Sequence, residues 1–242
     1  MTFPDKGGTM KNIKAIGWDL DDTLYQRGDF YRSVFETMQQ NVIKINHSFK
    51  EFYRIFEIQS DIEYEKFIRE GKEKDDYQID RVISTYNHFN YQISRDQAII
   101  FTSLYLYYRN HLKLHNDVSN VFKHLIDSGY ELFILTNGPS IDQRNKLSKL
   151  QIANWIPENR WFISEELNYS KPDIELFKQV EHTLGYQSHE LAYIGDNYQN
   201  DIFGSTQAGW HAVHYFHPAN NGKELNHPAT IHHIKEVINL FS

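Results

Sequence analysis

Short apolar runs occur once near the start of the chain and then repeatedly in its second half. They occupy residues 13–18, 130–135, 161–163, 191–194 and 212–216. Runs of this length, each ended by polar residues, are typical of buried strands in a parallel sheet. Between these runs, apolar residues recur at helical spacing. The clearest case is Phe177, Val180 and Leu184, which fall on one face of a predicted helix. Strands that alternate with helices predict an α/β fold with a doubly wound parallel sheet, a Rossmann-like core.

The interval 28–108 departs from this alternation because it contains helical patterns and no convincing strand. Apolar residues recur there at helical spacing, beginning with Phe30 and Val34. We therefore predict a helical cap domain over residues 28–108. It is inserted into a catalytic core formed by residues 1–27 and 109–242.

Composition places the chain among ordinary globular proteins. Of its 242 residues, 40% are hydrophobic and 24% charged, while the aromatic share of 15% is high and indicates aromatic packing between helices. The formal net charge of −7 argues against a nucleic-acid partner, which would require a basic surface. The absence of cysteine excludes disulfides, zinc thiolate sites and thiol catalysis. The charged stretch 70–76 is expected to form a solvated turn.

Neither a membrane segment nor a targeting segment is predicted. No apolar run reaches the roughly 18 residues that a membrane-spanning helix needs, and the first residues lack the apolar centre of a signal peptide. We expect a cytoplasmic protein without a membrane partner, as a monomer or homodimer. Residues 10–13 resemble a natural start, so residues 1–9 are left out of the fold prediction.

Two acids, Asp19 and Asp21, follow the first predicted strand directly. Ligands of open α/β sheets bind at the carboxyl ends of the strands, which is where these side chains would lie. A carboxylate can attack phosphorus to give an acyl phosphate, and a second carboxylate two residues further on can deliver and remove protons. Taken alone, the pair is weak evidence, because acidic turns after strands are common and the structural explanation is then the better one.

Candidate phosphate-binding groups follow later strands. Thr136 and Asn137 precede Gly138 after the second strand, and a hydroxyl followed by a glycine-containing turn offers donors for a phosphate oxygen. A helix cap is the ordinary alternative. Lys171 stands just ahead of a predicted helix, where its ammonium could neutralise a phosphate or could simply lie on the surface.

Asp196 and Asp201 bracket a loop after the fourth predicted strand. Asp196 could bind a hard cation while Asp201 supports it. Carboxylate ligands without cysteine or convergent histidine favour Mg²⁺ over zinc. His211, His214 and His217 fall on a predicted strand that would scatter them over both faces, so we assign them no metal site.

The order of these features is an acid pair, a threonine, a lysine and a second acid pair, each at or just beyond a predicted strand end. This order resembles the haloacid dehalogenase-like hydrolase superfamily, all four of whose signatures occur over residues 13–216. Residues 195–209 look most like subfamily I, in which a helical (C1-type) cap is inserted after the first motif. The Asp-Thr-Leu-Tyr at 22–25, together with Thr-Asn-Gly at 136–138, resembles the phosphatase and pyrimidine nucleotidase branch.

The resemblance implies a role for each candidate residue. It makes Asp19 the nucleophile and Asp21 the general acid and base. It implies that three residues bind the substrate phosphate: Thr136, Asn137 and Lys171. It implies that Mg²⁺ is bound by the Asp19 carboxylate, the Asp21 backbone carbonyl and Asp196. Asp201 would support the metal ligands.

The function implied by the resemblance is that of a magnesium-dependent phosphatase. It would hydrolyse a small phosphorylated metabolite through a phosphoaspartate, with a nucleoside monophosphate as the first candidate. A sugar phosphomutase stays open because it uses the same intermediate. A 2-haloacid dehalogenase needs neither magnesium nor the second acid, and a receiver-like signalling domain would carry its phosphoacceptor on a middle strand and lack the helical insert.

Overall fold

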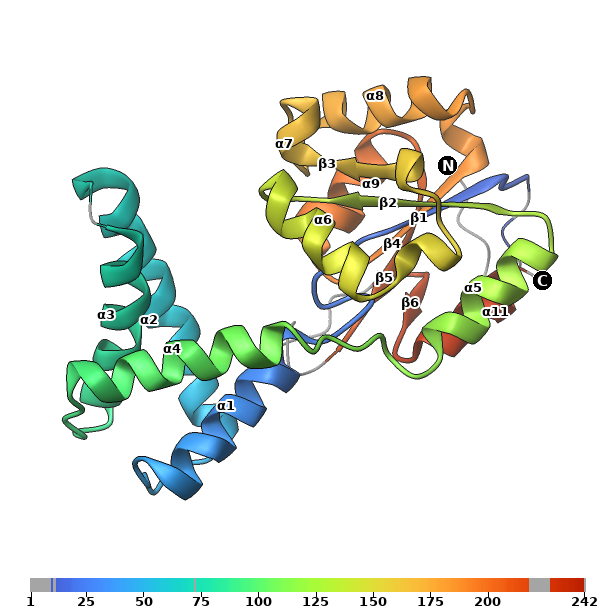
Figure 1. Cartoon of the computed structure of the whole chain (residues 1–242). Helices are drawn as coiled ribbons and strands as arrows, with labels where there is room; N and C mark the ends of the chain where they lie inside the picture. The colour runs from blue at the N-terminus through green and yellow to red at the C-terminus, as the bar shows by residue number, and fades with distance from the viewer. Residues whose placement is uncertain (1–9, 11, 72, 218–226, 242) are drawn as a thin grey trace. The chain divides into compact units, whose positions relative to one another are not determined.

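The computed structural model describes residue 10 and residues 12–71, 73–217 and 227–241, so residues 1–9 lie outside its described part. Contacts between residues divide the chain into two compact units (Figure 1). One unit combines Met1–Gln26 with Lys113–Ser242, and the other is Arg27–Leu112. Each unit has its own hydrophobic core. Within the described ranges, no helix combines the length and hydrophobicity required to cross a membrane.

The larger unit is built on a six-stranded sheet whose neighbouring strands are all parallel. Its strands are β1 (Ala15–Trp18), β2 (Glu131–Thr136), β3 (Trp161–Ile163), β4 (Leu191–Gly195), β5 (His211–Tyr215) and β6 (Thr230–Ile231). Their order is β3-β2-β1-β4-β5-β6, with β1 in the interior of the sheet (Figure 1). The prediction of a doubly wound α/β core is confirmed. The sixth strand was not predicted, since two residues are too few to form a hydrophobic pattern.

Helices surround this sheet in the order that the alternation predicts. They are α5 (Val118–Asp127), α6 (Ser140–Lys149), α7 (Ser164–Leu167), α8 (Ile174–Leu184), α9 (Gly204–Gln207) and α11 (Val237–Leu240). A π-helix covers Tyr198–Phe203, and short 3₁₀ helices cover Ile152–Asn154, Glu158–Arg160, Ser188–Glu190 and Ile234–Glu236.

Both faces of the sheet are packed, as its almost wholly buried strands require. On one face, Phe133 of β2 and Tyr193 of β4 share a core with Phe177 of α8. On the other, Trp18 of β1 packs edge to face against Phe122 of α5, with ring centres 5.1 Å apart. Side chains at the carboxyl edge of the sheet therefore extend from strands that are packed on both faces.

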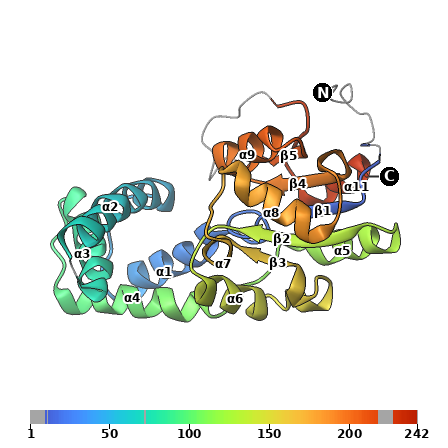
Figure 2. The ribbon, with the colours of Figure 1, turned by 90° about the horizontal axis from the view of Figure 1, so that it is seen from above.

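The smaller unit consists of helices without a strand among its described residues (Figure 2). They are α1 (Arg27–Asn41), α2 (Phe49–Glu70), α3 (Lys74–His88) and α4 (Arg95–Arg109). Helices α2 and α4 each have a serine N-cap, Ser48 and Ser94, which forms a capping box with the residue three positions further on. Buried aromatic rings fill the core between the helices, including Phe52, Phe56 and Phe101.

The charged stretch 70–76 is only partly a turn. Gly71 ends α2 in a left-handed conformation, but α3 already begins at Lys74. Asp75 and Asp76 therefore lie in the first helical turn, where acidic side chains are favoured by the helix dipole. Asp76 also pairs with Arg95 of α4 at 2.6 Å.

Candidate active site

The parallel sheet brings the predicted site residues to one edge. Asp19 follows β1, Thr136 ends β2 and Asp196 follows β4. Since β1 pairs with both β2 and β4, with Trp18 level with Ile134 and Ile194, the carboxyl ends of these strands are neighbours. This is the edge at which open α/β sheets bind ligands.

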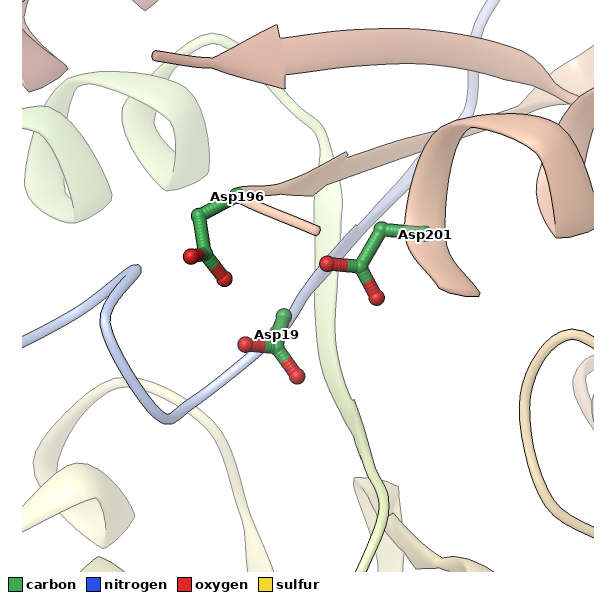
Figure 3. Close-up of side chains that lie close together, drawn as sticks. All are labelled: Asp19, Asp196 and Asp201. Atoms are coloured by element: carbon green, nitrogen blue, oxygen red, sulfur yellow. The ribbon is translucent and has the colours of Figure 1, made fainter. Parts of the chain in front are cut away.

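Three buried carboxylates meet at this edge and form what we call the acidic cluster: Asp19, Asp196 and Asp201 (Figure 3). One oxygen from each lies within 4.8 Å of the others. Only 6% of Asp19, 9% of Asp196 and 1% of Asp201 is exposed. So many buried carboxylates repel one another unless cations offset their charge.

Lys171 supplies one of these cations from the loop before α8. Its Nζ donates hydrogen bonds to Asp19 Oδ1 at 2.6 Å, Asp201 Oδ1 at 2.7 Å and Tyr193 Oη at 2.9 Å. Burial opposes the charge on Lys171, but the Asp19 and Asp201 carboxylates outweigh burial and raise its pKa well above the ordinary value. Lys171 therefore stays protonated and joins two members of the acidic cluster.

One ammonium does not balance three carboxylates. Burial raises the pKa of Asp19 to about 7, and the Asp201 and Asp21 carboxylates add to the rise while Lys171 opposes it. The protein alone thus leaves excess negative charge at the carboxyl end of β1. Oxygen donors with excess charge match the ligand preference of a hard divalent cation, so the acidic cluster could hold a metal.

The position of Asp201 depends on Gly195, the last residue of β4. A Cβ on Gly195 would lie 2.4 Å from Asp201 Cγ, so only glycine leaves room for this carboxylate beside the strand end. Asp201 sits in the π-helix, an irregularity that often marks functional positions. Its Oδ2 accepts a hydrogen bond from the Asn197 backbone N–H at 2.9 Å.

Two further residues hold the acidic cluster in place, although sequence reasoning gave them no role. Thr23 Oγ1 donates to Asp19 Oδ2 at 3.2 Å and accepts from the Asp196 backbone N–H at 3.1 Å. His214 lies buried on β5, and its Nε2 bonds the Asp196 carbonyl oxygen at 3.1 Å. A carbonyl only accepts, so Nε2 of His214 carries the hydrogen. Thr23 was part of the first acidic motif, and His214 was set aside with the other histidines of its strand.

Asp21 lies in a different environment, about one fifth exposed, and contacts a cation on α6. Lys146 Nζ lies 2.8 Å from Asp21 Oδ1 and 2.7 Å from Oδ2. Gln143 Nε2 donates to Asp21 Oδ2 at 3.0 Å, and the Tyr25 hydroxyl donates to Oδ1. Burial tends to raise the pKa of Asp21, but Lys146, Tyr25 and Gln143 together outweigh burial and lower it below its ordinary value.

The predicted phosphate-binding residues lie beside these acids. Thr136 is buried, and its Oγ1 accepts a hydrogen bond from Gln143 Nε2 at 3.2 Å. The side chain of Asn137 clamps the main chain of Lys171: its Nδ2 donates to the Lys171 carbonyl at 3.0 Å, and its Oδ1 accepts from the Lys171 N–H at 2.9 Å. The Asn137 side chain therefore fixes the loop that carries Lys171.

Gln143 and Lys146 were not predicted, and the pattern of α6 explains why. The helix carries few apolar residues, of which Leu147 is buried and Ile141 is 77% exposed. Its buried face could therefore not be recognised from periodicity. The one usable signal is that Gln143 and Lys146 lie three residues apart, which places them on the same side of a helix that starts just beyond Thr136.

Comparison with known proteins identifies a family and several relatives of this chain. The profile of the haloacid dehalogenase-like hydrolases matches residues 16–214. The glyceraldehyde 3-phosphate phosphatase of Methanopyrus kandleri is 27% identical over 210 residues, 81% of each chain. The pyrimidine 5'-nucleotidase PynA of Streptococcus pneumoniae is 30% identical over 92 residues, 38% of each chain.

The solved structures agree in fold. The structure of the HAD-hydrolase YfnB from Bacillus subtilis bound to magnesium matches with a TM-score of 0.65 at 19% identity, covering 94% of this chain and 97% of that one. The names of the sequence relatives confirm the prediction of an enzyme of the phosphatase class. Because the family profile matches residues 16–214, which is most of the chain and includes the four motifs described above, this chain belongs to the haloacid dehalogenase-like hydrolase family.

Proposed function

We propose that the chain is a magnesium-dependent phosphomonoester hydrolase that works through a phosphoaspartate on Asp19. The observation that carries the proposal is the acidic cluster at the carboxyl ends of β1 and β4, with Lys171 bonded to Asp19 and Asp201. Family membership supports hydrolase chemistry. The roles below follow from the environment of each side chain.

In the first step, an oxygen of the Asp19 carboxylate attacks the substrate phosphorus. The bond from phosphorus to the ester oxygen breaks, and the leaving oxygen takes a proton from Asp21. The acyl phosphate remains on Asp19. Thr23 and Lys171 hold the two Asp19 oxygens, so the nucleophile is oriented before substrate arrives.

In the second step, water attacks the phosphorus of the acyl phosphate. Asp21 takes the proton of this water, inorganic phosphate leaves, and the Asp19 carboxylate is restored. The lowered pKa of Asp21 suits the base role, since the ionised form prevails near neutral pH. Donation in the first step requires that the contact between Asp21 and Lys146 weakens while the leaving group is bound.

The proposed Mg²⁺ ligands are the Asp19 carboxylate, the Asp21 backbone carbonyl and Asp196, with Asp201 in support. The all-oxygen donor set and the excess negative charge of the acidic cluster fit this ion. When bound, Mg²⁺ supplies positive charge that offsets the repulsion between Asp19 and an anionic phosphate.

For the substrate phosphate we propose Thr136, Asn137 and Lys171. Because Thr136 Oγ1 already accepts from Gln143, its hydroxyl hydrogen is available for a phosphate oxygen. Asn137 contributes its backbone N–H and keeps Lys171 in place through its side chain. Lys171 brings the positive charge.

The alternatives fit these contacts less well. A dehalogenase requires neither a second acid nor a metal, so it does not account for the contacts that hold Asp21 or for the acidic cluster that could bind a cation. A receiver domain would carry its phosphoacceptor on a middle strand of the chain, whereas Asp19 follows the first. A phosphomutase shares every residue above, and only its products distinguish it from a hydrolase.

The substrate is proposed to be a small phosphorylated metabolite, either a triose phosphate or a pyrimidine nucleoside monophosphate. Two relatives motivate these classes through their names, the first over 81% of the chain and the second over 38%. Phosphate release should be measured over a panel of triose, sugar and nucleoside phosphates, with magnesium and with excess chelator. We expect release that requires magnesium and is fastest with one of the two classes. Full release in excess chelator would overturn the metal assignment, and isomerised substrate without release would indicate a mutase.

A further inference from the structure

The helical unit contains a pocket of about 480 Å³ that the catalytic proposal does not use. Its lining comes from α1, α2 and α3 alone and includes Tyr31, Phe56, Ser60, Tyr77 and Arg81. A volume of this size is enough for a small organic ligand.

Arg81 is the unusual member of the lining because it is a buried cation without an anionic partner. It is 7% exposed, and its guanidinium carbon lies 5.0 Å from the ring centre of Phe56 and 5.2 Å from that of Tyr77. Nη1 donates to the Tyr77 hydroxyl at 3.3 Å, whereas Nε has no hydrogen-bond partner. Across the described ranges, Arg81 forms no ion pair. Aromatic faces attract a guanidinium but do not neutralise it.

A second polar atom of the same pocket is also unsatisfied. Ser60 Oγ is buried and has no hydrogen-bond partner. Buried polar atoms are nearly always paired, so two unpaired donors in one pocket point to a bound group that pairs with both. An ordered water could pair with them but would leave the charge of Arg81 uncompensated.

The ligand class follows from the geometry of these donors and from the other charges of the pocket. A guanidinium edge matches a carboxylate, which accepts two parallel hydrogen bonds in one plane. Glu57, Asp61 and Arg27 also line the pocket, and all three are exposed. Together with Arg81 they carry no net charge, so a dianion such as a phosphate monoester would leave more uncompensated negative charge in the pocket than a monoanion. The rings of Tyr31, Phe56 and Tyr77 favour a flat, apolar body beside the carboxylate.

We propose that this pocket of the helical unit binds a small planar molecule carrying a single carboxylate. The carboxylate pairs with Arg81 Nε and the Ser60 hydroxyl, and the body of the ligand packs against the aromatic rings. The proposal concerns the helical unit alone and does not depend on the chemistry proposed at Asp19.

The first experiment follows backbone amide signals of the full chain by NMR while benzoate, benzamide or inorganic phosphate is added. Benzamide matches benzoate in shape but lacks the charge. We expect benzoate to shift amides of α1, α2 and α3 saturably, and benzamide to bind at least roughly tenfold more weakly, because hydrogen bonds to charged groups are the stronger ones. Equal binding of benzamide, no saturable shift with benzoate, or stronger binding of phosphate at these amides would each overturn the proposal.

The second experiment compares variants in the same benzoate titration. Arg81→Met keeps an unbranched side chain and should weaken benzoate roughly tenfold or more, while Ser60→Ala should weaken it roughly threefold. Arg69→Met is the matched control, because Arg69 is an exposed arginine at the C-terminal end of α2. This variant should change the affinity for benzoate less than twofold. Full benzoate affinity in Arg81→Met would contradict the proposal. If Arg81→Met does not fold, an unchanged affinity in Ser60→Ala would contradict it equally.

Discussion

Asp19 and Asp21 lie two residues apart on one loop and each contacts a lysine, yet the other charges around them differ. Asp19 faces the ends of β1 and β4, where Asp196 and Asp201 surround it and burial raises its pKa to about 7. Asp21 faces α6, where Lys146 contacts both of its oxygens and outweighs burial, so that its pKa is lowered. The two acids therefore differ in protonation at the same pH.

The environment of each carboxylate therefore determines its role. Two acids whose surroundings push their pKa values apart take different parts in a reaction. Asp19 needs a further cation besides Lys171 to stay ionised as a nucleophile, whereas Asp21 is already ionised and can accept a proton. Changes to either carboxylate, to Lys146 or to the metal test this contrast.

The largest effect is expected from Asp19→Asn. The variant lacks the attacking oxygen anion, so turnover should fall by at least roughly 10⁴-fold while the fold is kept. Phosphate release and thermal unfolding measure the two parts of this prediction. Asp22→Asn is the control: Asp22 has a left-handed φ of 67°, which asparagine also tolerates, and we expect its activity to be retained. Turnover of Asp19→Asn at the wild-type rate would remove Asp19 as nucleophile.

Asp21→Asn should slow turnover by roughly 10²- to 10⁴-fold, which is the usual contribution of a positioned acid or base. Because attack by Asp19 needs less help than hydrolysis of the acyl phosphate when the leaving group is good, phosphorylated enzyme should accumulate with p-nitrophenyl phosphate. Rapid acid quench followed by mass spectrometry of the intact chain measures this. Loss of activity with no phosphoenzyme under any condition would contradict the role of Asp21 in hydrolysis of the acyl phosphate and would limit Asp21 to its formation.

Lys146→Met should lower kcat about tenfold near pH 6 and move the acidic limb of the pH profile to higher pH. The sign follows from the contacts of Asp21: without the ammonium, burial prevails and its pKa rises. Lys149→Met, on the same helix three residues on, is the control and should leave the profile in place. An unshifted profile in Lys146→Met would mean that Asp21 does not set the acidic limb.

The smallest effect concerns stability without metal. The pKa of Asp19 is about 7 in the folded chain and 3.8 ordinarily, so between these values the folded state holds a proton that the unfolded chain has lost. The contribution of Asp19 to the free energy of unfolding therefore falls as the pH rises from about 4 to about 7. Calorimetry should show magnesium raising Tm by a few degrees at pH 8 and less at pH 5.5. A rise of the same size in Asp19→Asn at both pH values would contradict the assignment.

The sheet and its carboxyl edge could be predicted from the sequence because parallel strands buried on both faces consist of consecutive apolar residues. The strand β6 lacks such a run. At the site, the acids could be predicted from their place after strands, since that place alone brings Asp19 and Asp196 together.

The partners of these acids could not be predicted in the same way. Lys146 and Gln143 reach Asp21 from a helix more than 120 residues away, and nothing in a mostly polar helix marks which side faces a neighbour. Thr23 and His214 act through main-chain atoms of Asp196 or through one oxygen of Asp19. Such contacts depend on loop geometry, which a sequence pattern does not contain.

The central claim, a phosphoaspartate on Asp19 that water attacks at phosphorus, is tested most directly by a single turnover in oxygen-18 water. Enzyme in excess over substrate should release inorganic phosphate carrying the label, and the peptide that contains Asp19 should carry none. Label in the Asp19 peptide with unlabelled phosphate would mean attack at the carboxyl carbon, as in a dehalogenase-type ester, and would contradict the account.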